Sequence, residues 1–215
     1  MPILHGVNAS PFVRKARVAL AVKGIDYELN PVMPMGVSEE YKRKSPLGKI
    51  PCWEDGAFVL PDSSCIIAYL EASKPEPRLY PADPQQRGRA LWYEEYADTK
   101  LAETVGAVFF ERVVKAKILK APVDEARVSK TIQEALPVVF DYLEGEAPEA
   151  GDAIVGRRFS VADIAIGSQL LNLRHGGVTP DAARWPKLAA YAAAIHGNPW
   201  FKPIVEEETA QFASL

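Results

Sequence analysis

In residues 1–79, short apolar runs alternate with polar segments and turn residues, which is typical of a domain that mixes strands and helices. The first helix begins at Ser10, a favoured N-cap followed by Pro11, and ends at Gly24. Asp55-Gly56 is a strong signal for a two-residue hairpin turn. The predicted elements are a strand at 2–6, a helix at 10–24, a strand at 25–29, a helix at 38–44, strands at 50–54 and 57–60, and a helix at 62–73.

This βαβ-α-ββα order predicts a mixed sheet whose first two strands are parallel, which is the thioredoxin-like order. After a proline-rich stretch at 74–81 the strand pattern disappears. Helices are predicted at 83–119, 124–145, 161–173 and 187–196. We therefore expect two domains, α+β and then all-α. The thioredoxin-like domain is expected at 1–79, a linker at 80–86 and an all-helical bundle at 87–215.

The composition argues against several classes of protein. The net charge of −3 argues against a protein that binds nucleic acid, and the apolar runs are too short to span a membrane. The two cysteines, Cys52 and Cys65, are too few for a disulfide framework or a four-ligand zinc site, and both are expected in the core. We expect a cytoplasmic, metal-free protein without a secretory leader.

The turn before the first helix is the place where thioredoxin-like redox proteins carry Cys-x-x-Cys, and here Ser10 and Val13 occupy those positions. A hydroxyl at a helix N-terminus stabilises an anion. A hydrogen bond to a charged acceptor is worth about 1.5–3 kcal/mol, and the helix terminus adds about 0.3–2 kcal/mol. Together these lower the pKa of a bound thiol by roughly one to three units. The alternative is that Ser10 only caps its helix.

Two further motifs favour a peptide-like ligand that carries a thiol. A cis bond before Pro51 is expected to turn the N–H and C=O of Ile50 toward such a ligand. Asp62 and Ser63 are suited to an α-ammonium and an α-carboxylate, although helix capping alone also explains this pair. A zwitterionic end, a peptide backbone and a thiolate are the three features of glutathione.

With these motifs the chain resembles the cytosolic glutathione transferase superfamily, in particular the serine-type, theta/zeta/delta-like bacterial members. The resemblance is nearly end to end. It is carried by Ser10-Pro11-x-x-Arg14-Lys15-x-Arg17, Pro46-x-Gly48-Lys49-Ile50-Pro51, Asp62-Ser63 and Phe159-Ser160-Val161-Ala162-Asp163.

The resemblance implies that glutathione is the co-substrate and that Ser10, or Asn8 in its place, contacts the thiol. It further implies a structural helix cap made by Ser160 and Asp163. Two departures are visible: Asp62 is shorter than the family's more usual glutamate, and the Ser-Ser-Cys motif expected of a maleylacetoacetate isomerase is absent from the first turn. The implied glutathione-binding residues are Phe12, Lys49, Ile50, Pro51, Asp62 and Ser63.

The second substrate is expected between the glutathione domain and the first helices of the bundle, and it is expected to be a small, partly polar electrophile. A homodimer is implied by the resemblance, with Ser64, Trp92 and Tyr93 as candidate contacts. The candidate residues for the electrophile pocket are Tyr96, Lys100, Glu103, Thr104, Phe110 and Trp200, together with Phe12 and Phe201.

Three functions remain open from the sequence. The first is conjugation of glutathione to an electrophile, or reduction of a peroxide. The second is a glutathione-dependent isomerase or lyase, in which the thiolate adds to the substrate and later leaves. The third is a non-catalytic binding protein of the same fold. The sequence does not name the electrophile.

Overall fold

The computed structural model describes residues 1–149 and 153–214. The chain forms two compact units, Met1–Tyr80 and Pro81–Leu215. The first has the predicted thioredoxin-like fold and the second is helical, so the predicted fold class is confirmed. The predicted helical domain includes residues 150–152 and 215, which lie outside the described ranges. None of the described helices is both long enough and apolar enough to cross a membrane.

Four short strands make the sheet of the first unit, in the order β2-β1-β3-β4. β1 pairs in parallel with β2 and antiparallel with β3, and β3 and β4 form the predicted hairpin. The elements are β1 (Ile3–His5), α1 (Pro11–Lys23), β2 (Glu28–Asn30), α2 (Glu39–Lys44), β3 (Cys52–Asp55), β4 (Phe58–Pro61) and α3 (Ser63–Ser73).

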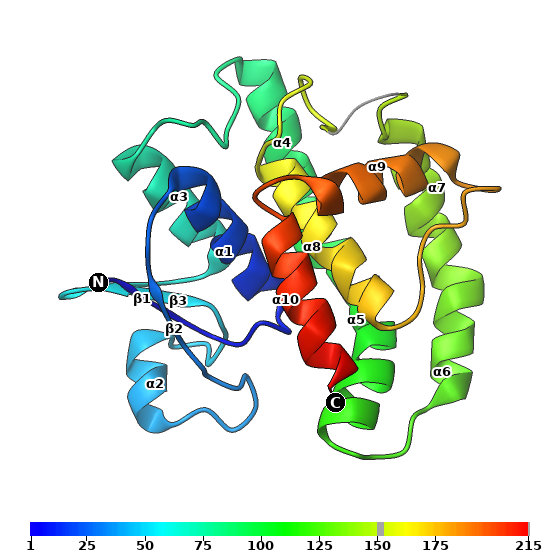
Figure 1. Cartoon of the computed structure of the whole chain (residues 1–215), viewed down its shortest axis with the longest axis horizontal. Helices are drawn as coiled ribbons and strands as arrows, with labels where there is room; N and C mark the ends of the chain where they lie inside the picture. The colour runs from blue at the N-terminus through cyan, green and yellow to red at the C-terminus, as the bar shows by residue number, and fades with distance from the viewer. Residues whose placement is uncertain (150–152, 215) are drawn as a thin grey trace. The chain divides into compact units, whose positions relative to one another are not determined.

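Helices cover both faces of this sheet. Figure 1 shows α1 and α3 on one side of it and α2 on the other. The apolar residues of α1 that recur at helical spacing, such as Val13, Ala16 and Leu20, are fully buried. Cys52 is buried as expected. Cys65 is exposed, so the prediction that it lies in the core is wrong. Its neighbours Ile66 and Ile67 are buried, as is Leu70 on the next turn of α3.

The end of the first unit is held by an ion pair between the buried Lys23 and the half-buried Glu71. Lys23, in the last turn of α1, donates to Glu71 at 2.5 Å and to the carbonyls of Pro75 and Pro77 at 3.3 and 2.6 Å. Glu71 in turn accepts from the backbone N–H of Leu79 at 3.0 Å. Each charge is therefore satisfied by its partner and by backbone groups, which a buried ion pair requires.

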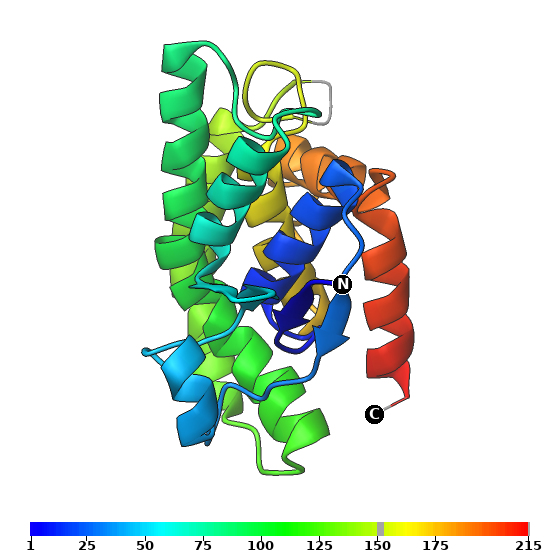
Figure 2. The same ribbon diagram turned by 90° about the vertical axis from the view of Figure 1, so that its left-hand side faces the viewer.

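In its described residues, 81–149 and 153–214, the second unit contains helices with three π-helical stretches, labelled η. The helix predicted at 83–119 is one continuous helical run from Pro84 to Ile118, drawn in green in Figure 2, and its lower part turns away from the direction of its upper part. It begins at Pro84, within the segment 80–86 that the sequence assigns to the linker. The elements are α4 (Pro84–Tyr96), η1 (Ala97–Leu101), α5 (Ala102–Phe109), η2 (Phe110–Ile118), α6 (Glu125–Lys130), η3 (Thr131–Ala135), α7 (Leu136–Glu146), α8 (Val161–His175), α9 (Pro186–Gly197) and α10 (Lys202–Ala213).

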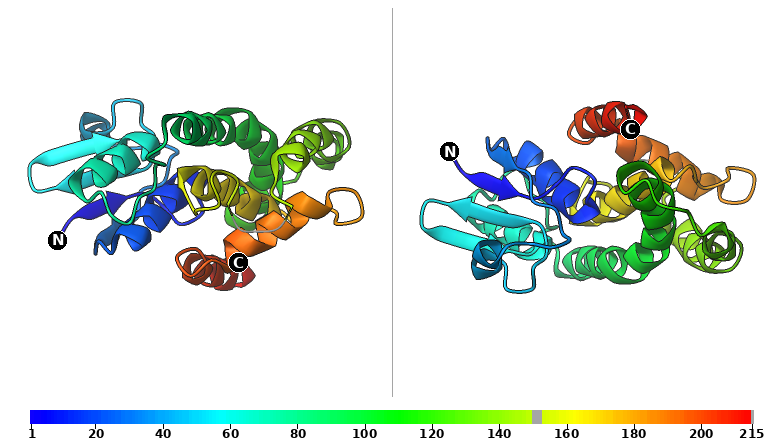
Figure 3. Two further views of the ribbon diagram at one scale, coloured as in Figure 1. Left: turned by 90° about the horizontal axis from the view of Figure 1, so that it is seen from above. Right: turned by 90° about the horizontal axis from the view of Figure 1, so that it is seen from below.

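Helix α8 is the centre of this unit, as its nearly uncharged sequence predicts. Figure 3 shows α8 between α4 and α5 on one side and α9 and α10 on the other. Every residue from Val161 to Leu173 is buried. A Cβ at Gly167 would approach Ile195 to 2.5 Å, so glycine permits the close approach of α9.

Two features of the helical unit differ from the predicted pattern. The helix predicted at 124–145 contains the π-helical stretch η3 directly before Pro137, which has no N–H to continue an α-helical ladder. Helix α10 was not predicted. Glu208 is fully buried on its inner face, where it pairs with His175 at 3.2 Å, and this acidic residue interrupts the apolar spacing of Val205 and Phe212.

The predicted cap of α8 is formed by a buried carboxylate. Oδ2 of Asp163 accepts from the N–H and the hydroxyl of Ser160, at 2.8 and 3.0 Å. Its Oδ1 accepts from the N–H of Ile154 at 2.8 Å and from the hydroxyl of Tyr191 at 2.7 Å. One side chain thus ties α8 to α9 and to the segment that precedes it.

Replacing Asp163 with alanine leaves four buried donors without their acceptor. We expect Asp163→Ala to lower the free energy of unfolding by about 3–5 kcal/mol, measured by urea denaturation. Asp124→Ala is the control, because Asp124 caps α6 at an exposed site through one bond to Arg127. That variant should lose only about 1 kcal/mol. Equal losses in the two variants would contradict the buried cap.

The same carboxylate predicts a pH dependence of stability. Burial raises the pKa of Asp163 to about 6, although its four hydrogen bonds oppose the shift. The folded state therefore binds a proton more tightly than the unfolded state, and this contribution to stability is lost as pH rises from about 4 to about 6. Asp163→Asn cannot titrate. The unfolding free energy of the wild type minus that of Asp163→Asn should decrease across this range, and a flat or rising difference would contradict the shift.

Candidate functional site

The register of the sheet brings the three predicted glutathione motifs to one end of the first unit. His5 pairs with Cys52, and Cys52 pairs with Pro61. The end of β1, the start of β3 and the end of β4 therefore lie next to one another. A Cβ at Gly6 would lie 3.5 Å from that of Ile50, which shows how closely the first two segments approach.

Ser10 is half-buried at the N-terminus of α1. Its Oγ accepts from the N–H of Val13 at 3.4 Å, so the predicted capping role is present. A hydroxyl that accepts through a lone pair still has its hydrogen to donate. Pro11 has no N–H, and the N–H of Val13 already donates to Ser10. The hydroxyl of Ser10 and the N–H of Phe12 are therefore the donors that this helix end can direct at an anion.

Asn8, the alternative thiol contact, is oriented by a buried arginine of α1. Its Oδ1 accepts from Arg17 at 2.9 Å, and the Nε of Arg17 donates to the hydroxyl of Tyr27 at 2.9 Å. Since the amide oxygen faces Arg17, the NH₂ group is the part of Asn8 that suits a thiolate. Arg17 belongs to the sequence motif, but the sequence did not reveal this orienting contact.

The Ile50–Pro51 peptide bond is cis, as the resemblance implied. Ile50 is buried, whereas the side chain of Lys49 is exposed. Within residues 1–149 and 153–214, neither the N–H nor the C=O of Ile50 takes part in a backbone hydrogen bond. Buried backbone polar groups are almost always paired, so this segment is suited to an extended peptide ligand.

Asp62 has a more constrained role than the sequence suggests. It adopts φ 79°, unusual for a residue other than glycine, and its N–H donates to the carbonyl of Pro51 at 3.2 Å. Oδ1 accepts from the N–H groups of Ser64 and Cys65 at 2.9 and 3.1 Å. Both bonds use one oxygen, which leaves the other for a cation. The N–H and hydroxyl of Ser63 are then the donors for a carboxylate.

The comparisons with known proteins agree with this geometry. Residues 4–78 match the family model "Glutathione S-transferase, N-terminal domain", and residues 109–208 match "Glutathione S-transferase, C-terminal domain". The chain belongs to the cytosolic glutathione transferase superfamily. Members of this superfamily use glutathione as co-substrate.

Individual relatives refine the placement within the superfamily. The chain is 29% identical to the maleylacetoacetate isomerase of Rattus norvegicus, covering 90% of this chain and 87% of the relative. It is 30% identical to the probable maleylacetoacetate isomerase 1 of Drosophila melanogaster, covering 80% and 69%. The solved structure of a glutathione S-transferase from Rhodospirillum rubrum F11 matches its fold with a TM-score of 0.85 at 24% identity, over 95% of this chain and 91% of that one.

The candidate residues for the electrophile lie on several parts of the helical unit. Lys100 and Glu103 are exposed and 3.7 Å apart. Thr104 is buried and donates to the carbonyl of Lys100 at 3.0 Å, so its hydroxyl serves its own helix. Tyr96 packs against Tyr142 with ring centroids 4.7 Å apart. Phe110 is exposed, Trp200 packs on Phe159, and Phe201 is fully buried against the ring of His196. Phe12 belongs to α1 of the first unit.

The three candidate dimer contacts differ in how exposed they are. Trp92 is exposed and Ser64 is half-buried. Tyr93 is only 2% exposed, and its hydroxyl donates to Glu146 within the helical unit. Tyr93 therefore presents almost no surface to a partner subunit, because it is buried inside the helical unit, where its hydroxyl joins α4 to α7.

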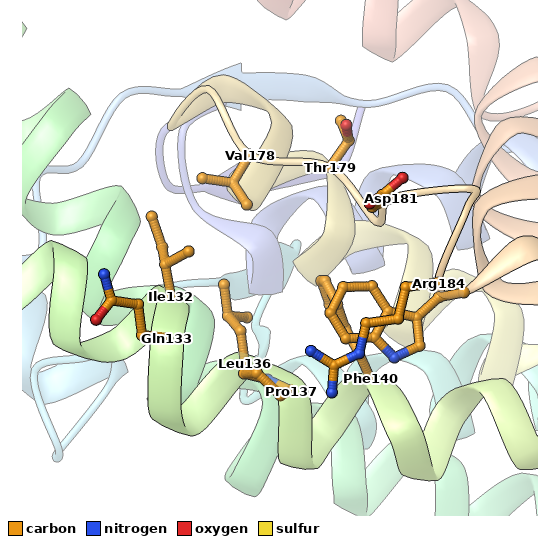
Figure 4. Close-up of a pocket in the computed structure, with 10 residues that line it drawn as sticks. Ile132, Gln133, Leu136, Pro137, Phe140, Val178, Thr179, Asp181 and Arg184 are labelled. Carbon is orange, nitrogen blue, oxygen red and sulfur yellow. The ribbon is translucent and has the colours of Figure 1, made fainter.

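A pocket of about 430 Å³ in the helical unit was not predicted. Figure 4 shows its two walls, the η3–α7 helix and the segment 178–185. Arg184 stacks on Trp185 at 4.2 Å and pairs with Asp141 at 3.5 Å. None of the predicted site residues lines this pocket. Its lining is Ile132, Gln133, Leu136, Pro137, Phe140, Val178, Thr179, Asp181, Arg184 and Trp185.

The two cysteines should react at different rates. Burial raises the pKa of Cys52 to about 11, although Lys44 opposes the shift, whereas the thiol of Cys65 is exposed. Because the thiolate is the reactive form, we expect Cys52 to react at least about a hundredfold more slowly than Cys65 with a disulfide reagent at neutral pH. In Cys65→Ser the fast phase should vanish until the protein is unfolded. A fast phase that survives in this variant would show that Cys52 is reactive.

Proposed function

We propose that this protein is a glutathione transferase in which the Ser10 hydroxyl donates a hydrogen bond to the glutathione thiolate. The observation that carries the proposal is the strand register. It brings together three sets of donors and acceptors that suit the three chemically distinct parts of glutathione. Ser10 suits the thiol, the N–H and C=O of Ile50 suit the cysteinyl backbone, and Asp62 with Ser63 suits the γ-glutamyl end.

The proposed chemistry is electrostatic stabilisation of the sulfur anion. The hydroxyl of Ser10 and the N-terminus of α1 lower the thiol pKa by roughly one to three units, which makes the thiolate abundant near neutral pH. The thiolate then attacks an electrophilic carbon, displacing a leaving group or adding to an activated double bond. Alternatively it attacks a peroxide oxygen, which breaks the O–O bond and releases an alcohol, and a second glutathione converts the resulting sulfenic acid to the disulfide with loss of water. Lys49, which directly precedes Ile50, is exposed and is proposed to attract the glycine carboxylate of glutathione.

A glutathione-dependent isomerase is the second candidate, and two relatives named as maleylacetoacetate isomerases favour it. In that reaction the thiolate adds to the substrate, a bond rotates and the thiolate leaves. Both reactions use the same glutathione site. The first turn of this chain, Asn8-Ala9-Ser10-Pro11, lacks the Ser-Ser-Cys motif, and for this reason we place conjugation first.

We further propose a cytoplasmic homodimer that acts on a small electrophile in detoxification. The electrophile site is proposed to include Lys100, Glu103 and Tyr96, with Phe110 and Trp200 as apolar contacts. A non-catalytic protein of the same fold, which binds ligands or protein partners, is the third candidate. Calorimetry with glutathione at millimolar concentration tests the binding step that the two enzymatic candidates share, and failure to bind would favour the third.

Ser10→Ala tests the proposed thiolate contact. In the variant we expect the pKa of bound glutathione, followed by ultraviolet titration of the thiolate, to rise by about one to two units. We expect kcat/KM to fall about 10- to 100-fold at neutral pH. Affinity for glutathione should change by less than about threefold, because the other contacts remain.

Asn8→Ala is the matched variant, since Asn8 lies in the same turn and presents an amide. It should shift the thiol pKa less than Ser10→Ala does. The serine assignment would be lost if the wild-type thiol were unshifted, or if Asn8→Ala alone abolished the shift.

Counting free thiol during turnover separates transferase from isomerase. With an activated aryl halide, each turnover of a transferase should consume one equivalent of thiol. With maleylacetoacetate, an isomerase should convert the substrate at constant free thiol. Rapid turnover of the second probe without loss of thiol, and none of the first, would reverse our order of candidates.

A further inference from the structure

Two hydroxyl groups associated with α2 contact the backbone carbonyl directly before Ile50. The hydroxyl of Tyr41 donates to the carbonyl oxygen of Lys49 at 3.0 Å, and the Oγ of Ser45 donates to the same oxygen at 2.7 Å. Both side chains are buried, with Tyr41 6% and Ser45 1% exposed. We call this pair of contacts the α2 clamp. We infer that the clamp positions Ile50 for glutathione, an inference that rests on the proposed function of this site.

The geometry of the peptide group makes the clamp directional. The Lys49–Ile50 bond is not among the cis bonds of the described chain, so its C=O and N–H point in opposite directions within one plane. The clamp holds the Lys49 oxygen toward α2. The N–H of Ile50 must therefore point away from α2, toward the side where a peptide ligand can accept from it.

The clamp is preorganised by its own short segment. The N–H of Ser45 donates to the carbonyl of Tyr41 at 2.9 Å, and the N–H of Gly48 donates to the carbonyl of Ser45 at 2.8 Å. Gly48 takes φ 63°, which favours glycine and turns the chain back toward the helix. Burial raises the pKa of Tyr41 well above its usual range, so its hydroxyl remains a donor at any pH the protein meets.

Side chains of the sheet also contact α2. The ring of Tyr41 packs edge-on against His5, with centroids 6.1 Å apart. Glu54 accepts from Lys44, the last residue of α2, at 2.5 Å and contacts His5 at 2.7 Å. Lys44 and His5 together hold the pKa of Glu54 below its usual range. Figure 1 shows α2 on the side of the sheet opposite α1 and α3, where these contacts join it to the sheet.

Tyr41 and Ser45 are therefore positioning residues, which act through the Lys49–Ile50 peptide and touch neither the thiol nor Ser10. Their loss should weaken the binding of glutathione without changing the pKa of its bound thiol. Ser10→Ala should do the opposite. The two opposite outcomes distinguish residues that position the glutathione-binding backbone from a residue that stabilises the thiolate.

The test uses the full-length variants Tyr41→Phe and Ser45→Ala and the double variant. We expect each single substitution to raise the dissociation constant of glutathione about three- to tenfold by calorimetry, and the double substitution to raise it further. The titration of bound thiol should stay within about 0.3 units of the wild type. In the free protein, the amide ¹⁵N resonance of Ile50 should move, because the Lys49 carbonyl of the same peptide group loses a hydrogen bond.

Ser38→Ala is the matched control. Ser38 caps the same helix through the N–H of Tyr41 at 3.1 Å, and it does not touch Lys49. It should lower the melting temperature and leave the Ile50 resonance at its wild-type position. The glutathione affinity should stay within about twofold of the wild type. Equal weakening by Ser38→Ala, or unchanged affinity in the double variant, would overturn the clamp. If the wild type itself did not bind glutathione, the proposed function would fail, whatever the variants did.

Discussion

Antiparallel pairing of β3 with both β1 and β4 is the constraint on which the first unit depends. Each of these strands is only three or four residues long, and few hydrogen bonds hold them together. Because side chains alternate between the faces of a strand, a shift of one residue would move Leu4 and Trp53 to the face that α2 covers and would expose His5 and Cys52 to the packing of the opposite face. The same shift would separate the segments that carry Ser10, Ile50 and Asp62. Packing of the core and assembly of the candidate site are thus set by one choice of register.

Polar side chains reinforce that register on the face that α2 covers. His5 in β1 contacts Asn30 in β2 at 2.8 Å and Glu54 in β3 at 2.7 Å, so one ring joins three strands. Lys44 completes the group from α2. His5 is the buried member of this group, and both of its ring nitrogens have a partner on a neighbouring strand, which a buried polar group requires. The network favours one alignment of strands over its neighbours, which apolar contacts alone specify less sharply.

Local sequence signals predicted the elements and the motifs, because capping residues, turn glycines and hairpin dipeptides act over a few positions. Ser10, Asp55-Gly56 and the Ser160–Asp163 cap are of this kind. Tyr41 and Ser45 were missed since their partner is a backbone carbonyl, which any residue provides. Helix α10 was missed since a buried Glu208 looks like a surface residue until His175 is found beside it. The electrophile candidates were chosen by helical spacing. Such spacing predicts which residues share one face of a helix, but it does not predict which other elements pack on that face.

The buried contacts of Lys23 define the end of the first unit in chemical terms. The ammonium group needs the carbonyls of Pro75 and Pro77, and Glu71 needs the N–H of Leu79. A fragment that stopped at the end of α3, at Ser73, would keep every helix and strand of the thioredoxin-like fold. It would nevertheless bury a cation that had lost two of its three acceptors. The shortest autonomous version of this fold therefore extends through Tyr80, so a segment without regular secondary structure belongs to the folding unit as fully as any helix does.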